Sequence, residues 1–344
     1  MTRPRHQFST DLRAVFHEHA LLLVVVGAYF VSVAAFFLVT GLREFWIIRW
    51  FYPSLALMFV VWSTAWLLVS RAARRVDHVA GATLVALIAA PFQSTFNSVK
   101  QVIDNAYGYR WDATFAEADR WLHFGRHPWE WLEPVVAHRG LIRFIDLCYM
   151  LWFPIVIGFV IWAAWSGDRA LRRRALVAVA LVWVLCGNVA ALAFSSAGPC
   201  YYDAVVTGHD PFARLMVILD GHHEGSFLFA RSNQTGLWNA MQSNAWLPFG
   251  GVSAMPSVHV AMAVLIALIA GARNGTAGMI LTMFALMTML GSVVLGWHYA
   301  IDGYLGALMA YAIWRAVIGR ARPASLFSNR SHCRDPYRSA RAAH

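Results

Sequence analysis

Charged residues are scarce in this chain. Asp, Glu, Lys and Arg make up 13% of its 344 residues, about half of the share that a soluble domain carries. Hydrophobic residues account for 59% and aromatic residues for 14%. A soluble protein of this length needs a charged exterior, so the composition argues against an ordinary soluble domain and indicates an exterior that faces lipid.

Lysine is almost absent, and Lys100 is the only one. The net charge of +10 is therefore carried almost entirely by arginine. The arginines lie in short stretches between apolar runs, which is typical of membrane orientation and of contact with anionic lipid. The same pattern argues against nucleic-acid binding, which needs basic residues gathered on one surface.

Cysteine is also rare. Cys148, Cys186, Cys200 and Cys333 are scattered without the spacing of a metal site. A Cys148–Cys200 disulfide is conceivable because both residues are expected near one face of the membrane, although nothing in the sequence requires it. His222-His223-Glu224 does not predict a metal site, because adjacent side chains seldom point at one ion. No metal and no other cofactor is expected.

Eight apolar segments are long enough, or nearly so, for the roughly 20 residues of a membrane helix. The segments lie near 20–41, 47–70, 78–97, 141–165, 175–195, 257–272, 276–296 and 298–318. They predict an all-α integral membrane protein with about eight transmembrane helices. The first segment is too long for a signal peptide and is expected to remain as an anchor.

The arginines orient these segments. Seventeen of them fall before the first segment, between the second and third, the fourth and fifth, and the sixth and seventh, and after the eighth. These are Arg3, Arg5, Arg13, Arg71, Arg74, Arg75, Arg169, Arg172, Arg173, Arg174, Arg273, Arg320, Arg322, Arg330, Arg334, Arg338 and Arg341. With eight spans all of them share one side, so both termini are expected in the cytoplasm. The mouths of the sixth and eighth segments then open on the extracytoplasmic side.

The same pattern divides the chain into four parts. Residues 1–97 are expected to hold a cytoplasmic N-terminus and three spans, and residues 98–140 an extracytoplasmic interfacial segment rich in Trp and Phe. Residues 141–318 form the membrane core with an extracytoplasmic cap at 196–256, and residues 319–344 a basic cytoplasmic tail. The expected location is a bacterial inner or cell membrane, or an endomembrane in a eukaryote.

The motif Gly296-Trp297-His298-Tyr299-Ala300-Ile301-Asp302 places two ionisable residues at the end of an apolar segment, where they are costly and usually functional. His298 and Asp302 are four residues apart, so their side chains share a helix face. A carboxylate beside one imidazole nitrogen fixes the tautomer and leaves the other nitrogen basic. The pair predicts a nucleophilic histidine with an orienting carboxylate, although a polar pair that joins helices has the same spacing.

The motif Ser253-Ala254-Met255-Pro256-Ser257-Val258-His259 opens a helix with a Pro-Ser step. The N–H groups of a helix start, together with the Ser257 hydroxyl, can bind an anion. Gly250 and Gly251 upstream let the backbone approach closely. His259 on the first turn can give a proton to a leaving oxygen. Two histidines and one aspartate at neighbouring helix ends predict a site for phosphoryl transfer.

The two motifs resemble those of the type 2 phosphatidic acid phosphatase superfamily, whose second motif ends in Pro-Ser-x-His and whose third contains His-x-x-x-Asp. Phe249-Gly250 before Met255-Pro256, and Tyr299 after His298, are closer to its inositolphosphotransferase branch, the inositol phosphorylceramide synthases. The similarity runs from about residue 95 to residue 315. It implies the core helical bundle of that superfamily, with His298 as the site of a phosphohistidine, His259 as general acid and Asp302 as the orienting residue.

Two departures separate the chain from the phosphatases of that superfamily. Gly291 and Ser292 stand where the third motif has Ser-Arg, and Tyr107-Gly108 stands where the first has Arg-Pro. The arginine clamps are therefore missing, as they are in the inositolphosphotransferase branch, and the positive charge must come from other residues. The expected phosphate-binding candidates are Lys100, Arg110, Arg231, Ser257 and Gly251.

Other polar residues have weaker expectations attached to them. Asp112 and Asp119 are expected to pair with Arg120 or Arg126 on an exposed face, with hydrogen bonding to a polyol headgroup as the alternative. Tyr201-Tyr202-Asp203 is expected at the lip of the site.

The expected activity is that of a membrane-embedded lipid phosphotransferase. The resemblance implies a phosphoinositol-like headgroup moved between lipids, from phosphatidylinositol to a sphingolipid or a diacylglycerol-type lipid. The partners are lipids within the bilayer, with no nucleic acid and no obligate protein partner. A phosphatase for phosphatidate, another phosphorylated glycerolipid or a polyprenyl pyrophosphate is the alternative at the same site. A transporter or scramblase fits less well, because such proteins need ionisable groups near the midplane and often show repeats.

Overall fold

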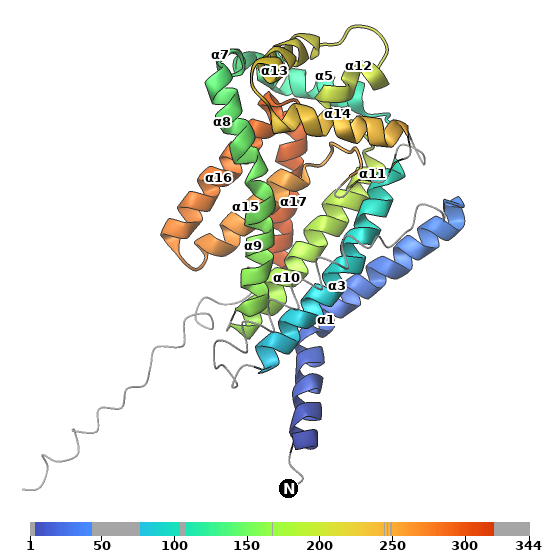
Figure 1. The fold of residues 1–344 in the computed structure, drawn as a ribbon, viewed down its shortest axis with the longest axis vertical. Coiled ribbons are helices and arrows are strands. Elements are labelled where there is room, and N and C mark those ends of the chain that lie inside the picture. The colour runs from blue at the N-terminus through green and yellow to red at the C-terminus, as the bar shows by residue number, and fades with distance from the viewer. Residues whose placement is uncertain are drawn as a thin grey trace, which may run out of the picture.

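The computed structural model describes residues 4–42, 76–103, 108–166, 168–243, 245, 247 and 250–319. Within these ranges the chain is helical and contains no strand, in agreement with the predicted all-α class. The predicted span 47–70 and the basic tail lie outside the described residues. Figure 1 shows a bundle of long helices with a layer of short helices at one end.

Within the described ranges, eight helices form the bundle. They are α1 (Pro4–Thr40), α3 (Val76–Gln101), α8 (Arg139–Met150), α9 (Trp152–Trp165), α10 (Arg169–Val184), α15 (Val258–Gly271), α16 (Gly275–Val294) and α17 (Ala300–Val317). Helix α8 runs on into α9, and α10 runs through a π-helical stretch, Leu185–Ala190, into α11 (Ala191–Ala193).

Five stretches of the described chain are long and apolar enough to cross a membrane. They are Arg13–Thr40, Ala80–Gln101, Arg139–Trp165, Arg169–Ala193 and Gly275–Val294. These stretches identify the chain as a multi-pass membrane protein.

The predicted number of eight spans is not confirmed. Helix α15 has 14 residues, fewer than a span needs, because it begins only after its cap at Ser257 and ends at Gly271. Helix α17 has 18 residues but carries Asp302 in its first turn and Arg315 in its last.

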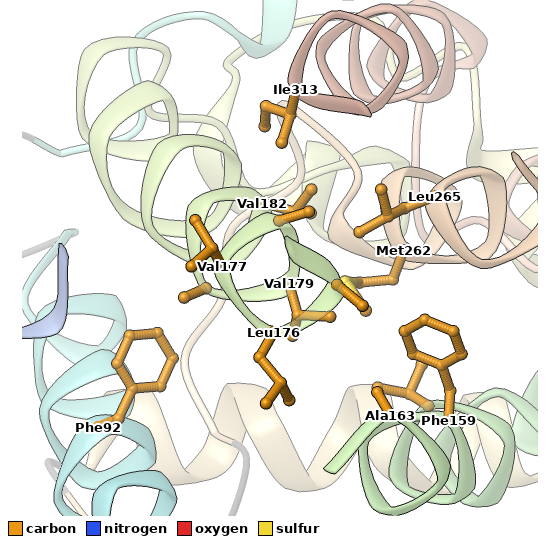
Figure 2. Packing of buried hydrophobic residues seen from close by; sticks show 14 of the residues in the cluster. Phe92, Phe159, Ala163, Leu176, Val177, Val179, Val182, Met262, Leu265 and Ile313 are labelled. Atoms are coloured by element: carbon orange, nitrogen blue, oxygen red, sulfur yellow. The ribbon is translucent and has the colours of Figure 1, made fainter. Parts of the chain in front are cut away.

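Helix α10 lies at the centre of the bundle. Figure 2 shows Leu176, Val177, Val179 and Val182 of this helix among side chains of the surrounding helices. The neighbours drawn there are Phe92 of α3, Phe159 and Ala163 of α9, Met262 and Leu265 of α15 and Ile313 of α17. From Ala175 to Val184 this helix is apolar on all sides, which suits such a buried position.

Helix α16 lies at the outside and packs on α15. Its residues Met279, Ile280, Met283 and Leu286 are between 57% and 62% exposed, so this side offers an apolar surface to lipid. On the inner side, a Cβ at Gly278 would lie 2.4 Å from the Cα of Gly271 in α15. Small residues at such contacts let membrane helices pack closely.

The layer of short helices forms a cap over one end of the bundle (Figure 1). Its helices are α5 (Asp112–Leu122), α6 (Pro128–Trp131), α7 (Glu133–Ala137), α12 (Tyr202–Val205), α13 (Ala213–Gly225) and α14 (Phe229–Gln242). A buried cluster that includes Phe115, Phe212 and Leu215 of the cap joins it to Val294 and Tyr299 of the bundle. The cap therefore packs on the turn between α16 and α17, which carries His298.

An open groove of about 1020 Å³ lies where the cap meets the outer side of α16 and α17. It is lined by Trp131 and Leu132 of the cap, Leu290 of α16 and Tyr304 of α17, among others.

Candidate active site

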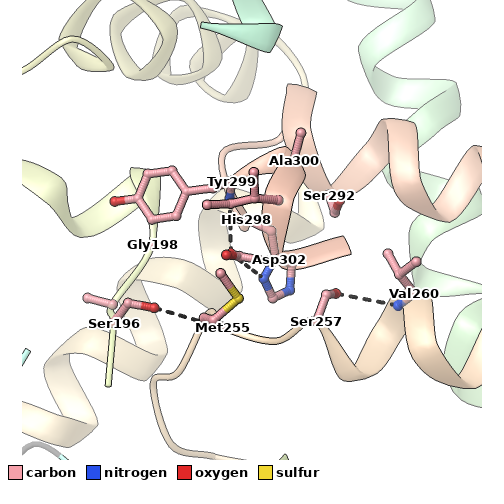
Figure 3. Close-up of polar contacts among 12 residues, drawn as sticks. Ser196, Gly198, Met255, Ser257, Val260, Ser292, His298, Tyr299, Ala300 and Asp302 are labelled. Carbon is pink, nitrogen blue, oxygen red and sulfur yellow. Dashed lines mark hydrogen bonds and ion pairs between the residues drawn. The ribbon is translucent and has the colours of Figure 1, made fainter. Parts of the chain in front are cut away.

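The start of α17 holds His298 beside Asp302. The Nδ1 atom of His298 lies 3.3 Å from Oδ2 of Asp302, and the same oxygen accepts a hydrogen bond of 3.1 Å from the Tyr299 N–H (Figure 3). Asp302 is completely buried. One carboxylate oxygen therefore orients the imidazole and caps the helix that follows it. The contact between His298 and Asp302 that their spacing of four residues predicts is therefore present.

The start of α15 is fixed against the same carboxylate residue. Ser257 is the N-cap residue, and its hydroxyl accepts a hydrogen bond from the Val260 N–H. The Ser257 N–H donates to the backbone carbonyl of Asp302 at 3.0 Å. Pro256 precedes the cap rather than lying in the first helical turn as expected. The hydroxyl and the N–H of Ser257 are thus both engaged within the protein.

The two imidazoles face each other across these helix starts. The ring centroids of His259 and His298 are 6.2 Å apart. His259 is held by aromatic neighbours, with Tyr149 stacked on it at 5.0 Å and Trp152 at 4.2 Å. The indole N–H of Trp152 also donates to the His259 backbone carbonyl at 2.9 Å. The His298 ring lies beside the Ala254 backbone, within hydrogen-bonding reach.

Two carboxylates of α5 brace this arrangement. Asp119 accepts hydrogen bonds from the N–H groups of Ala300 at 3.0 Å and Ile301 at 3.1 Å, so it caps the start of α17. Asp112 accepts from the Tyr299 hydroxyl at 2.9 Å and from the Gly198 N–H at 2.8 Å. Burial raises the pKa of both carboxyl groups, against the lowering effect of these donors.

The expectation that Asp112 and Asp119 lie on an exposed face was wrong, because both are buried and pair with N–H and O–H donors. Arg120 pairs instead with Glu117 on the outer side of α5. The two aspartates are seven residues apart on an amphipathic helix, whereas Glu117 and Arg120 fall on its other side. That spacing is the signal from which their shared inward face could have been found.

Lys100 is the phosphate-binding candidate that the fold brings to the histidines. It lies in the last turn of α3, and its charge acts on both His259 and His298. Gly251 packs directly on it, with a positive φ of 100° and with an added Cβ only 2.6 Å from the Cβ of Lys100. The close backbone approach expected at Gly251 is therefore present.

The two arginine candidates are engaged differently. Arg231 of α14 forms an ion pair of 2.6 Å with Asp220 and donates to Gln234 at 2.8 Å. Arg110 is exposed, and its N–H donates to the Ser195 carbonyl. The positive charge of Lys100, in contrast, acts on both histidines.

A family model described as the PAP2 superfamily matches residues 113–316, more than half of the chain and the stretch that contains both histidines. The chain belongs to the PAP2 superfamily. Members of this superfamily are generally phosphatases or phosphotransferases. Neither a curated protein nor a solved structure matches the chain. The narrower assignment to the inositolphosphotransferase branch stays a prediction.

A small pocket in this PAP2 protein opens beside Lys100 and Gly251. Tyr109, Met241 and Leu247 also line it. The pocket lies between the end of α3, helix α14 of the cap and residues 250–252 before α15.

The other residues singled out in the sequence have structural contacts. His222 bonds to the Val136 carbonyl, and His223 accepts from the Leu228 N–H. Tyr201 and Tyr202 are buried in the cap, and Tyr201 donates to the Gln234 carbonyl. Over the described ranges no group of three or more His, Cys, Asp or Glu side chains could hold a metal ion, and Cys148, Cys186 and Cys200 are free thiols.

Proposed function

We propose that this PAP2 protein is a lipid phosphotransferase that acts through a phosphohistidine on His298. The observation that carries the proposal is the pair of imidazoles whose centroids are 6.2 Å apart, with one ring oriented by Asp302. In-line transfer needs a nucleophile on one side of the phosphorus and an acid within hydrogen-bonding reach of the leaving oxygen on the other. The two rings are close enough together to serve one phosphoryl group in these two roles.

In the first step Nε2 of His298, the ring nitrogen that Asp302 does not engage, attacks phosphorus. The P–N bond forms as the P–O bond to the leaving alcohol breaks, and protonated His259 gives its proton to that oxygen. Asp302 stays bonded to Nδ1 and stabilises the positive charge that develops on the ring. A bound phosphate anion favours the protonated form of His259 before the step.

In the second step an acceptor hydroxyl attacks the phosphohistidine. His259, now neutral, takes the proton of that hydroxyl, and the P–N bond breaks. Both histidines return to their starting forms, so the cycle is balanced. The ammonium of Lys100 supports the charge on the phosphoryl oxygens in both steps.

The acceptor decides the reaction class. The resemblance to the inositolphosphotransferase branch supports a lipid alcohol as acceptor, with a phosphoinositol-like headgroup transferred at the extracytoplasmic face. Water as acceptor would make the protein a phosphatase for phosphatidate or a polyprenyl pyrophosphate. A pocket that excludes water favours the lipid alcohol.

The test uses purified protein in vesicles that contain phosphatidylinositol labelled with ³²P, with and without ceramide. We expect label to move to ceramide, and a ³²P-protein adduct that is stable to base and labile to acid. His298→Ala should abolish both signals. His209→Ala, at an exposed histidine of the cap, is the matched control and should keep them. Release of inorganic phosphate from phosphatidate without any acceptor would favour the phosphatase. Turnover in His298→Ala at a tenth of the wild-type rate would exclude the phosphohistidine.

A further inference from the structure

A buried tyrosine beside the histidine pair has an unpaired hydroxyl. Tyr149 of α8 is 4% exposed, and its hydroxyl has no hydrogen-bond partner among the residues that the structure describes. Other buried tyrosine hydroxyls are paired, such as that of Tyr29 with Asn188 at 2.5 Å. A buried hydroxyl without a partner is unfavourable, so such a group is expected to meet a ligand.

The ring of Tyr149 is held from two sides. One face stacks on His259, with centroids 5.0 Å apart and an interplanar angle of 18°. On another side it contacts α16 at Gly291, where an added Cβ would lie 3.0 Å from Cδ2 of Tyr149. The absence of a side chain at Gly291 therefore makes the space in which the tyrosine ring lies.

Tyr149 also packs in the region of the turn that carries His298. It belongs to the buried cluster that includes Leu295 and Tyr299, which flank that turn. Tyr149 thus contacts one catalytic histidine and shares a buried cluster with the residues that flank the other.

Helix α16 supplies no other donor at this level. Gly291 has no side chain, and the Ser292 hydroxyl is buried and donates to the Met289 carbonyl at 2.7 Å. A phosphoryl group between the two imidazoles has three oxygens to satisfy, and a phenol is a suitable neutral donor in a buried site.

We propose that the Tyr149 hydroxyl donates a hydrogen bond to a non-bridging oxygen of the phosphoryl group that lies between His259 and His298. The inference rests on the proposed function and adds a substrate-binding residue to it. The bond strengthens as negative charge grows on that oxygen in the transition state, so it contributes to turnover more than to ground-state binding.

The test is Tyr149→Phe, which keeps the stack on His259 and the contact with Gly291 while it removes the hydroxyl. Because one donor to a developing oxyanion is worth about 10²-fold in rate, we expect kcat/KM to fall by about 10- to 100-fold. The inhibition constant for orthovanadate, a phosphoryl transition-state analogue, should rise by a similar factor. The melting temperature should not fall, because no hydrogen bond of the free protein is lost.

Tyr29→Phe is the matched control, since it removes a buried hydroxyl that is paired within the bundle. It should lower the melting temperature and leave kcat/KM and vanadate inhibition unchanged. 4-Fluorophenylalanine introduced at position 149 keeps the shape of tyrosine without the donor and should lose activity as Tyr149→Phe does.

Turnover and vanadate inhibition of both position-149 variants within twofold of wild type would overturn the assignment of Tyr149. Failure of the proposed function has a different signature. In that case the wild-type protein itself shows no vanadate-sensitive turnover and no phosphohistidine.

Discussion

At the scale of single residues, one carboxylate oxygen joins structure and chemistry. Oδ2 of Asp302 accepts from both the His298 ring and the Tyr299 N–H. The proposed nucleophile, His298, is therefore oriented by the same hydrogen bonds that begin α17. Such an arrangement tolerates little change, because moving the carboxylate disturbs the ring and the helix start together.

Asp302→Asn should reduce kcat by about 10²- to 10⁴-fold, as loss of the orienting carboxylate does in a catalytic triad. The measurement is turnover of labelled phosphatidylinositol by the purified variant. Asp168→Asn is the matched control, since Asp168 also accepts at a helix start, from the Leu171 N–H of α10, but lies outside the site. Activity of Asp302→Asn above a tenth of wild type would exclude the orienting role.

Gly251 permits the contact that places Lys100. Gly251→Ala should destabilise the protein and reduce turnover, because the new Cβ would overlap Lys100 at 2.6 Å in addition to the strain of a positive φ. Gly208→Ala isolates that strain, because Gly208 has a φ of 109° with nothing within 4 Å. We expect Gly208→Ala to lower the melting temperature slightly with activity intact. Equal loss of activity in both variants would mean that the Lys100 contact is unimportant.

At the scale of elements, α5 supports the start of α17, which carries the proposed catalytic pair. Asp119 accepts from the first two N–H groups of α17, and Asp112 accepts from Tyr299 and Gly198. The composition of α5 predicts a helix at the membrane interface. Its two aspartates nevertheless hold the start of α17 and the turn at Gly198 in place. Its outer face, with Glu117 and Arg120, makes only an exposed ion pair.

Asp119→Ala should destabilise the protein by about 1–2 kcal/mol, the usual cost of losing a helix cap. Glu117→Ala, on the exposed side of the same helix, should change the stability by less than about 0.5 kcal/mol. Thermal unfolding in detergent measures both. Equal melting temperatures for the two variants would mean that the hydrogen bonds from Ala300 and Ile301 to Asp119 contribute nothing to stability.

The sequence was informative about local features and less so about distant partners. The pairing of His298 with Asp302, and the helix that begins after Ser257, follow from spacing within a single turn. The bond from Asp119 to Ala300 joins residues 181 positions apart, and no local pattern specifies such a partner. The ion pair that engages Arg231 has the same origin, because Asp220 becomes its neighbour only when α13 and α14 pack together.

At the scale of the whole molecule, the cap lies at one end of the bundle over the turn that carries His298, and the α15–α16 turn lies away from the cap (Figure 1), where Arg273 pairs with Asp168 before α10. The apolar face of α16 runs between them with its large side chains exposed. A membrane that contacts this face separates the two ends. The arginine pattern predicts that the end with the cap is extracytoplasmic.

Single cysteines introduced at the two ends test that orientation. His209→Cys in the cap should react with an impermeant maleimide added to intact cells, because residue 209 is exposed. Thr276→Cys, exposed at the α15–α16 turn, should react only after the membrane is opened. Labelling of the protein without an introduced cysteine measures the background reaction of its own thiols. The reverse order of labelling would place the histidines in the cytoplasm.

The hydrogen bonds between α5 and α17 also lie next to a surface that is separate from the proposed phosphate site. The groove lined by Trp131 and Tyr304 reaches Ala300, whose N–H is bonded to Asp119. A hydrophobic compound that bound in this groove and displaced Asp119 from that N–H would disturb the helix start that positions His298. Inhibition of this allosteric kind would persist at saturating lipid, since drug and substrate would occupy different sites.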